Sequence, residues 1–253
     1  ELRSTRGTSS HQHNPFVILC DPSCTEETGE CYGAGLIYSG SFLAEAEVDQ
    51  FHQTRLVMGI SPDQFSWMLN PGESFQTPEV ALIYSGEGFT PLSHKFHRMA
   101  SEHLIRGQWA KKRRPILINN WEATYFNFNG EKLLNIAREA KELGIEMLVL
   151  DDGWFGKRDS DYSGLGDWTV NEKKLGGSLK ELAEKVNALG MKFGLWVEPE
   201  MISEDSNLYR SHPDWTMRIP GRPGNVARSQ FVLDFSRPEV VGGIQEMMLK
   251  VVD

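Results

Sequence analysis

The pattern of hydrophobic and polar positions changes character near residue 90. Before that point the two kinds of residue alternate over short stretches, as they do through most of 42–49, and a period of two is typical of half-buried β-strands. Segments 33–38 and 55–60, and the alternation of Phe65, Trp67 and Leu69, predict further strands. Turn residues separate these segments, as in Asn70-Pro71-Gly72. Short strands at this spacing predict a β-sandwich portion over residues 1–90.

A helical pattern follows. Phe96, Met99, Ala100 and Leu104 recur at spacings of three and four residues, which predicts a helix over 92–105. The basic run at 111–114 comes after it, and we interpret this run as a solvated linker rather than a binding patch. Residues 91–114 are therefore expected to join the sandwich to the next domain.

From residue 115 to residue 253 the pattern alternates between strands and helices. Short apolar runs predict strands at 116–119, 147–150 and 193–197. Apolar stripes predict helices between them, one ending at Gly144 and one with Ser178 as its N-cap and Gly190 after its end. A short strand is expected at 231–235 and a last helix from Pro238.

Repeated β-α units predict parallel strands covered by helices. Both an open doubly wound sheet and a (β/α)₈ barrel fit this pattern. A barrel needs eight units and about 250 residues of its own, whereas three clear units are visible here. Either the sheet is small and open, or the chain stops before the barrel is complete. The predicted fold class is therefore α/β plus all-β.

Composition excludes several classes of partner. The chain has 35 acidic and 26 basic residues and a net charge of −9, which argues against a nucleic acid or an anionic membrane as partner. No run of about eighteen apolar residues occurs, so no membrane span is predicted. No signal peptide is visible, although the chain lacks an initiator Met. Cys20, Cys24 and Cys31 are interpreted as free thiols in a cytoplasmic protein, and no metal site is expected because zinc-site spacing is missing.

Candidate chemistry gathers where the three predicted strands end, which is where β/α folds carry their active sites. Each end combines an aromatic residue with carboxylates or amides: Asn119-Asn120-Trp121-Glu122, Asp151-Asp152-Gly153-Trp154 and Trp196-Val197-Glu198-Pro199-Glu200. Aromatic rings stack on the apolar faces of sugars, and carboxylates accept hydrogen bonds from their hydroxyls. Two adjacent Asp residues are costly to hold together unless both find donors. Neighbouring hydroxyls of a sugar would supply those donors.

Each candidate also has a purely structural interpretation. Asp151 or Asp152 would cap a helix, Trp154, Phe155 and Trp196 would pack in the core, Glu198 and Glu200 would bind backbone amides in a turn, and Arg228 would be a surface charge. The five His residues at 11, 13, 94, 97 and 103 have no metal-site spacing and are interpreted as surface or structural residues. The chain contains no P-loop, Rossmann glycine pattern or Ser nucleophile elbow.

Several motifs in order make the chain resemble the bacterial α-galactosidases of glycoside hydrolase family thirty-six. The motifs lie at 115–123, 150–156, 166–168, 195–201 and 232–238, and two further matches lie upstream at 10–16 and 70–75. The resemblance implies an N-terminal β-sandwich, a linking helix and a (β/α)₈ barrel. It implies hydrolysis of terminal α-linked galactose, as in melibiose and raffinose, with retention and without a cofactor, in a parent protein that is often a homo-oligomer. By the same resemblance Asp151, Asp152, Trp196 and Arg228 bind the substrate.

The family pattern places both catalytic carboxylates beyond this sequence. Its nucleophile is an Asp in a Lys-Trp-Asp motif on the fourth barrel strand, which would begin after Asp253, and its acid/base follows later. We therefore expect no catalytic residue in this chain, and neither Glu198 nor Asp152 is assigned such a role. The chain alone is expected to be inactive, and poorly soluble or self-associating because its sheet would have an open edge.

Three other functions remain open. The same fold could transfer galactose to another sugar or accept N-acetylgalactosamine, and the missing residues would discriminate between these. The chain could instead be a non-catalytic sugar-binding module, or a structural piece without affinity for any ligand. Weak galactose binding without turnover would support the binding module.

Overall fold

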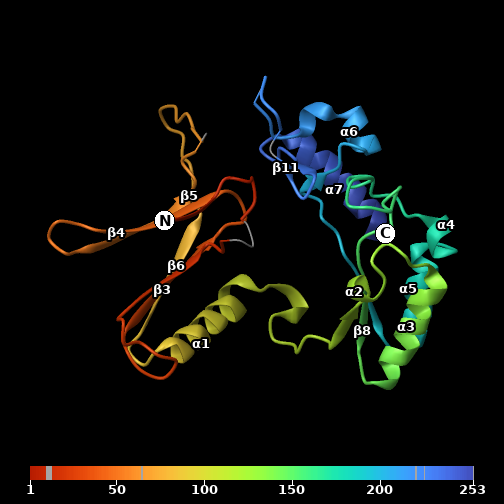
Figure 1. Ribbon diagram of the computed structural model, residues 1–253, viewed down its shortest axis with the longest axis horizontal. Coiled ribbons are helices and arrows are strands. Elements are labelled where there is room, and N and C mark those ends of the chain that lie inside the picture. The colour runs from red at the N-terminus through yellow and green to blue at the C-terminus, as the bar shows by residue number, and fades with distance from the viewer. Residues whose placement is uncertain (10–12, 64, 220, 225, 253) are drawn as a thin grey trace. The chain divides into compact units, whose positions relative to one another are not determined.

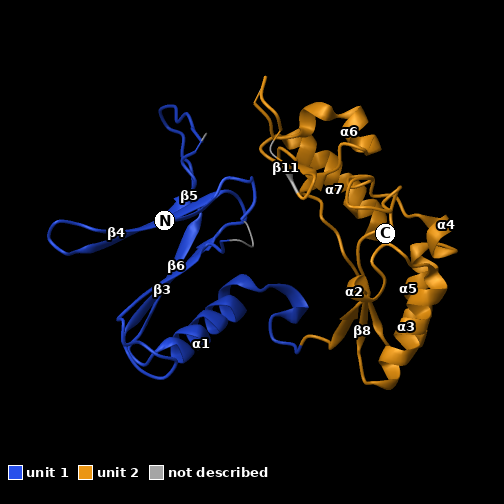
Figure 2. Cartoon of the chain, viewed as in Figure 1, with its two compact units in different colours: residues 1–113 blue, residues 114–253 orange. Residues whose placement is uncertain are grey.

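The computed structural model describes residues 1–9, 13–63, 65–219, 221–224 and 226–252. The chain divides into two compact units, Glu1–Arg113 and Arg114–Asp253 (Figure 2). His11, whose role was predicted above, and the first residues of the 10–16 motif lie outside the described residues, as does Asp253.

The first unit is built from two antiparallel sheets of three strands each (Figure 1). One sheet has the order β1-β4-β5 and the other β2-β3-β6. Their bounds are β1 Leu2–Ser4, β2 Phe16–Cys20, β3 Cys31–Ile37, β4 Phe42–Val48, β5 Thr54–Ile60 and β6 Glu79–Ser85. Leu36 from one sheet and Phe42 and Ala44 from the other are buried in one small core. The period-two pattern at 42–49 and at the two segments around it is thus confirmed as strands.

Phe65, Trp67 and Leu69 do not form the predicted strand. The described residues between Ser61 and Pro78 are irregular, and the rings of Phe65 and Trp67 pack on Phe75, with centroids 5.9 and 4.9 Å apart. The prediction was wrong because alternating hydrophobic and polar residues form a strand only where a neighbouring strand provides partners for the backbone hydrogen bonds. Here the aromatic side chains pack within their own loop.

A helix packs on the second sheet of this unit. α1 (Phe89–Met99) begins three residues before the predicted start and continues as the π-helical turn Ala100–Leu104. Gly33 on β3 makes this packing possible, because a Cβ there would lie 2.5 Å from the ring of Phe96. The ring of Phe96 also meets Phe16 of β2 edge-on, at 5.0 Å between centroids.

The second unit contains the three predicted parallel strands. β7 (Leu117–Asn119), β8 (Met147–Leu150) and β9 (Lys192–Leu195) form one sheet in the order β7-β8-β9. α3 (Gly130–Glu142) and α5 (Leu179–Ala188) lie side by side and bury their apolar stripes against it (Figure 1). Ser178 caps α5 in a capping box with Glu181, as its position predicted.

Shorter elements complete this unit. They are α2 Trp121–Thr124, α4 Glu172–Leu175, β10 Met201–Ile202, α6 Asn207–Ser211, the 3₁₀ turn Pro213–Trp215, β11 Val226–Ala227, β12 Gln230–Val232 and α7 Pro238–Val252. The first unit has one further element, the 3₁₀ turn Gly107–Trp109, among its described residues. β10, β12 and β11 make a small antiparallel sheet in that order. The expected strand at 231–235 is thus shorter and starts one residue earlier, while the helix from Pro238 is confirmed. No helix in the described part of the chain has the length and apolar character needed to cross a membrane.

Candidate functional site

The carboxyl ends of the three parallel strands bring the predicted polar residues together. β7 and β8 pair so that Asn119 lies beside Val149, and β8 and β9 pair so that Leu150 lies beside Leu195. Asp151 and Trp196 follow directly, and the amide side chain of Asn119 donates a hydrogen bond to the Asp151 carboxylate. The strand register therefore places residues that are far apart in sequence at one edge of the sheet.

Asp151 is oriented by its neighbours and remains half-buried. Its backbone N–H donates to Oδ1 of the buried Asn120 at 2.8 Å, and the Asn120 amide in turn donates to Thr124 at 2.9 Å. The Asp151 carboxylate accepts from the backbone N–H of Asp152 at 2.7 Å. These contacts fix an ionisable acceptor that solvent, or a ligand, still reaches.

Asp152 lies in a different environment, because it is buried against Arg158. The residue is 2% exposed, and Arg158 is 0% exposed. Nε of Arg158 donates to both carboxylate oxygens, at 2.9 and 3.0 Å, and Nη2 donates to Oδ2 at 2.8 Å. Asn119 and Arg158 of the protein thus already donate to the two carboxylates, and the expectation that sugar hydroxyls also donate to them stays a prediction.

Gly153 allows the chain to turn back and deliver that arginine. Its φ is +99°, and a Cβ would lie 3.0 Å from the ring of Phe126 and 3.2 Å from the backbone oxygen of Arg158. A side chain at this position would therefore be strained and crowded. The sequence pattern did not identify Arg158. The signal that could have found it is the Asp151-Asp152 pair itself, because each of two adjacent carboxylates requires a hydrogen-bond donor nearby.

The two aromatic residues after Gly153 belong to the core. Trp154 and Phe155 are both 0% exposed and meet edge-on at 4.9 Å between centroids. The indole N–H of Trp154 donates to the backbone oxygen of Trp196 at 3.0 Å. The structural interpretation thus holds for Trp154 and Phe155, whereas Trp196 itself is half-buried at the end of β9.

Glu198 and Arg228 form a second, looser carboxylate–arginine contact. Nη1 of Arg228 lies 3.8 Å from Oε1 of Glu198, whose side chain is 12% exposed. Burial raises the pKa of Glu198 to about 7; Arg228 and Arg158 act to lower this pKa, while Glu200 and Asp152 act to raise it. The other oxygen, Oε2, is buried without a hydrogen-bond partner among the described residues.

Arg228 sits in an unusual backbone conformation. Arg228 and Ser229 form the two-residue turn between β11 and β12, with φ of 52° and 62°. Positive φ at both central positions is the pattern of type I′ hairpin turns, in which Asn and Gly are preferred. Side chains at these positions are therefore held at a cost in strain, a feature that clusters at functional sites. Arg228 also lies 4.0 Å from Asp161.

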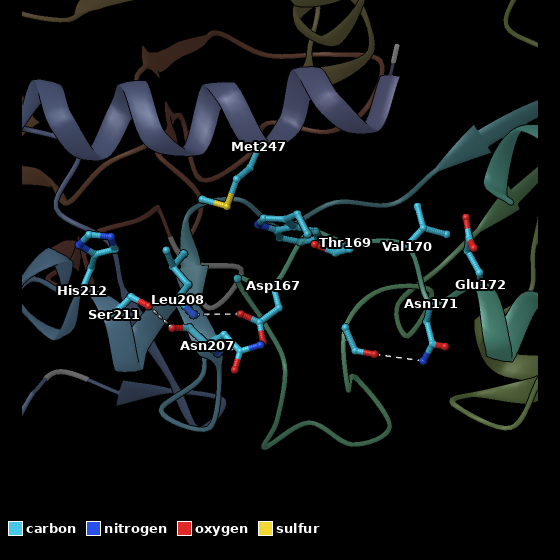
Figure 3. A pocket seen from close by; sticks show the side chains of 13 residues that line it. Asp167, Thr169, Val170, Asn171, Glu172, Asn207, Leu208, Ser211, His212 and Met247 are labelled. Carbon is cyan, nitrogen blue, oxygen red and sulfur yellow. Dashed lines mark hydrogen bonds between the residues drawn. The ribbon is translucent and has the colours of Figure 1, made fainter.

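A separate pocket of about 550 Å³ lies between α6, α7 and the loop before α4 (Figure 3). Its polar side chains include groups that already have protein partners. Both oxygens of Asp167 accept backbone N–H groups of α6, at 2.9 and 3.0 Å, and Asn171 donates to Gly156 at 3.0 Å. None of the four predicted substrate-binding residues lines it. Within the described residues no group of three or more His, Cys, Asp or Glu is placed to hold a metal ion.

Comparison with known families confirms the family resemblance that the sequence motifs indicated. The profile of the Melibiase family matches residues 74–253, and that of the glycosyl hydrolase family 36 N-terminal domain matches residues 1–70. This chain belongs to the Melibiase family. The match includes the whole sheet that carries Asp151 and Trp196, and the turn that carries Arg228.

Individual relatives are similar along nearly the whole chain. Alpha-galactosidase AgaA of Geobacillus stearothermophilus is 56% identical over 248 residues, which are 98% of this chain and 34% of that protein. The crystal structure of alpha-galactosidase AgaB from the same organism has a TM-score of 0.91 at 56% identity, covering 99% of this chain and 35% of that chain. A crystal structure of a doubly substituted variant of AgaA in complex with raffinose has a TM-score of 0.92 at 55% identity, covering 99% of this chain and 35% of that chain. The chain thus spans about a third of the length of the relatives it matches.

Proposed function

We propose that this chain supplies the galactose-binding part of an α-galactosidase, which releases terminal α-linked galactose from oligosaccharides such as melibiose and raffinose with retention of configuration. The observation that carries the proposal is the half-buried Asp151 carboxylate, oriented by Asn119 beside Trp196 at the strand ends. A fixed acceptor next to an aromatic ring suits a sugar, which has both hydroxyls and apolar faces. Family membership and a relative crystallised with raffinose support it.

Asp151, Asp152, Trp196 and Arg228 have distinct roles in this proposal. Asp151 accepts hydrogen bonds from galactose hydroxyls directly, while Asp152 has less room because Arg158 already holds both of its oxygens. Trp196 contacts an apolar face of the ring, and Arg228 donates from the β11–β12 turn. No metal or organic cofactor has a role in the reaction as proposed.

The proposed architecture extends what the two units show. The two sheets of the first unit are part of a β-sandwich, and β7, β8 and β9 with their helices are the first three units of a (β/α)₈ barrel. The catalytic carboxylates of a retaining enzyme lie about 5–5.5 Å apart. We assign neither role to a described residue: both oxygens of Asp152 accept hydrogen bonds from Arg158, and Glu198 has one oxygen buried and the other facing Arg228.

Calorimetric titration with galactose and with glucose tests the proposal, because the two sugars differ only in the orientation of one hydroxyl. We expect galactose to bind more tightly than glucose, and Asp151→Asn to reduce galactose affinity about tenfold, since one charge-assisted hydrogen bond is lost. Glu246→Gln makes the same change in an exposed residue of α7 and should leave the affinity unchanged. Equal affinity for both sugars, or no binding of either, would contradict the proposal.

A further inference from the structure

The guanidinium of Arg158 has more contacts with Asp152 than an ion pair requires. The side chains of Arg158 and Asp152 are 0% and 4% exposed, so neither charge has a hydration shell to stabilise it. Three N–H···O contacts of 2.8 to 3.0 Å join them, and Nη1 donates to the backbone oxygen of Ser163 at 3.1 Å. The guanidinium carbon lies 5.7 Å from the ring centroid of Phe126. All three nitrogens of the guanidinium thus donate hydrogen bonds within the protein, and two of them hold the Asp152 carboxylate.

Stability alone does not account for such a pair. Removing two charges from water costs about as much as their attraction returns, and apolar residues of similar volume often serve as well or better. A buried ion pair is therefore weak evidence for a stabilising role. It does fix the orientation of a carboxylate, because the planar fork of arginine matches both oxygens at once.

The orientation matters because of what lies beside it. The backbone N–H of Asp152 donates to the Asp151 carboxylate at 2.7 Å, so the Asp151 side chain is tied to the backbone that carries Asp152, directly after β8. A carboxylate has about four lone-pair directions, and the contacts from Arg158 leave capacity for a further donor. The position of that remaining lone pair is set by Arg158.

We infer that Arg158 is a positioning residue, which aims the free lone pair of Asp152 at a single hydroxyl of the bound sugar. This inference rests on the proposed function, since it presupposes that galactose binds at the strand ends. Arg158 does not touch the sugar; it acts through Asp152. Its contribution is therefore specific to one hydroxyl, whereas a residue that only supports the loop 157–163 would contribute equally to every hydroxyl contact.

Sugars lacking one hydroxyl at a time separate these two roles. Affinities for galactose and for its four monodeoxy derivatives at carbons 2, 3, 4 and 6 are measured by calorimetry on the wild type, on Arg158→Lys and on Asp152→Asn. Lysine keeps the positive charge but lacks the fork. The matched control is Arg210→Lys, an exposed arginine paired with Asp205 in the same unit.

We expect Arg158→Lys to weaken galactose binding about tenfold, in line with the loss of one hydrogen bond to a charged group. One deoxy sugar should bind the wild type and Arg158→Lys equally, and the same deoxy sugar should be insensitive to Asp152→Asn. Arg210→Lys should change none of the affinities. An equal loss for all five sugars, or no loss for galactose, would overturn the inference.

A second variant covers the case in which Arg158→Lys does not fold. The double change Asp152→Asn with Arg158→Gln replaces both charged groups with neutral amides, so no buried charge is left unpaired. It should bind the selected deoxy sugar as the wild type does and galactose about tenfold more weakly. Wild-type protein that does not bind galactose overturns the proposed function itself, whereas wild-type binding with uniform losses in the variants overturns only the role of Arg158.

Discussion

Two arginine–carboxylate pairs lie at the strand ends of the second unit, and they differ in distance and burial. Arg158 and Asp152 are within 2.8 Å and almost fully buried, whereas Arg228 and Glu198 are 3.8 Å apart, with the Arg228 side chain 55% exposed. In the first pair both carboxylate oxygens accept hydrogen bonds, while the second pair leaves one carboxylate oxygen without a partner among the described residues. The buried pair fixes geometry; the looser pair leaves a carboxyl group able to change its protonation state near neutral pH.

The two pairs should differ most in how much the free energy of unfolding falls when the arginine of each pair is replaced. Arg158→Met leaves the Asp152 carboxylate buried and unpaired, which should lower the free energy of unfolding by about 3–5 kcal/mol. Arg228→Met breaks a long, partly exposed contact and should cost less than about 1 kcal/mol. Urea unfolding of both variants and the wild type measures this. Similar losses for the two variants would contradict the distinction between a buried and a loose pair.

The raised pKa of Glu198 predicts a pH dependence of stability. The folded state holds this proton up to about pH 7, while the unfolded chain releases it near the ordinary Glu pKa of about 4.3. Stability from this residue is therefore fully present below about pH 4.3 and is lost as the pH rises through 7, by on the order of 3–4 kcal/mol.

Glu198→Gln isolates that contribution, because the amide does not titrate. The free energy of unfolding of wild type minus variant, measured from pH 4 to pH 8.5, should fall across this window. In an Arg228→Met background the fall should extend to higher pH, since Arg228 acts to lower the Glu198 pKa. Parallel curves for wild type and Glu198→Gln would show that the carboxyl group titrates normally.

Substitutions at Ser229, in the turn that carries Arg228, should have the smallest effect on stability. Ser229→Gly relieves the steric cost of φ = 62° and should stabilise the protein by about 1 kcal/mol or less. Ser229→Ala retains the Cβ and should show no such gain. Thermal unfolding of the two variants measures the difference. A gain for alanine equal to that for glycine would mean that the turn stores no strain at this residue.

Local periodicity was sufficient for much of the second unit. The apolar run 147–150 became β8 with the same bounds, and Ser178 caps α5 as its sequence position indicated. Local periodicity gave the wrong prediction at Phe65, Trp67 and Leu69, because no strand pairs with this alternating segment. Hydrophobic pattern records which residues avoid water, and it does not record what they pack against.

The candidate site shows the same division. The sequence alone determined that Asp151, Asp152, Trp196 and Glu198 follow parallel strands, because the β-α rhythm and the strand-end positions are local properties of the chain. Only the tertiary structure decided that Asp151 stays half-buried while Asp152 is buried against Arg158, that Trp154 and Phe155 belong to the core, and that Glu198 is desolvated. Burial and ion pairing depend on which distant segments meet at a residue, and those contacts exist only after the sheet and its loops have formed.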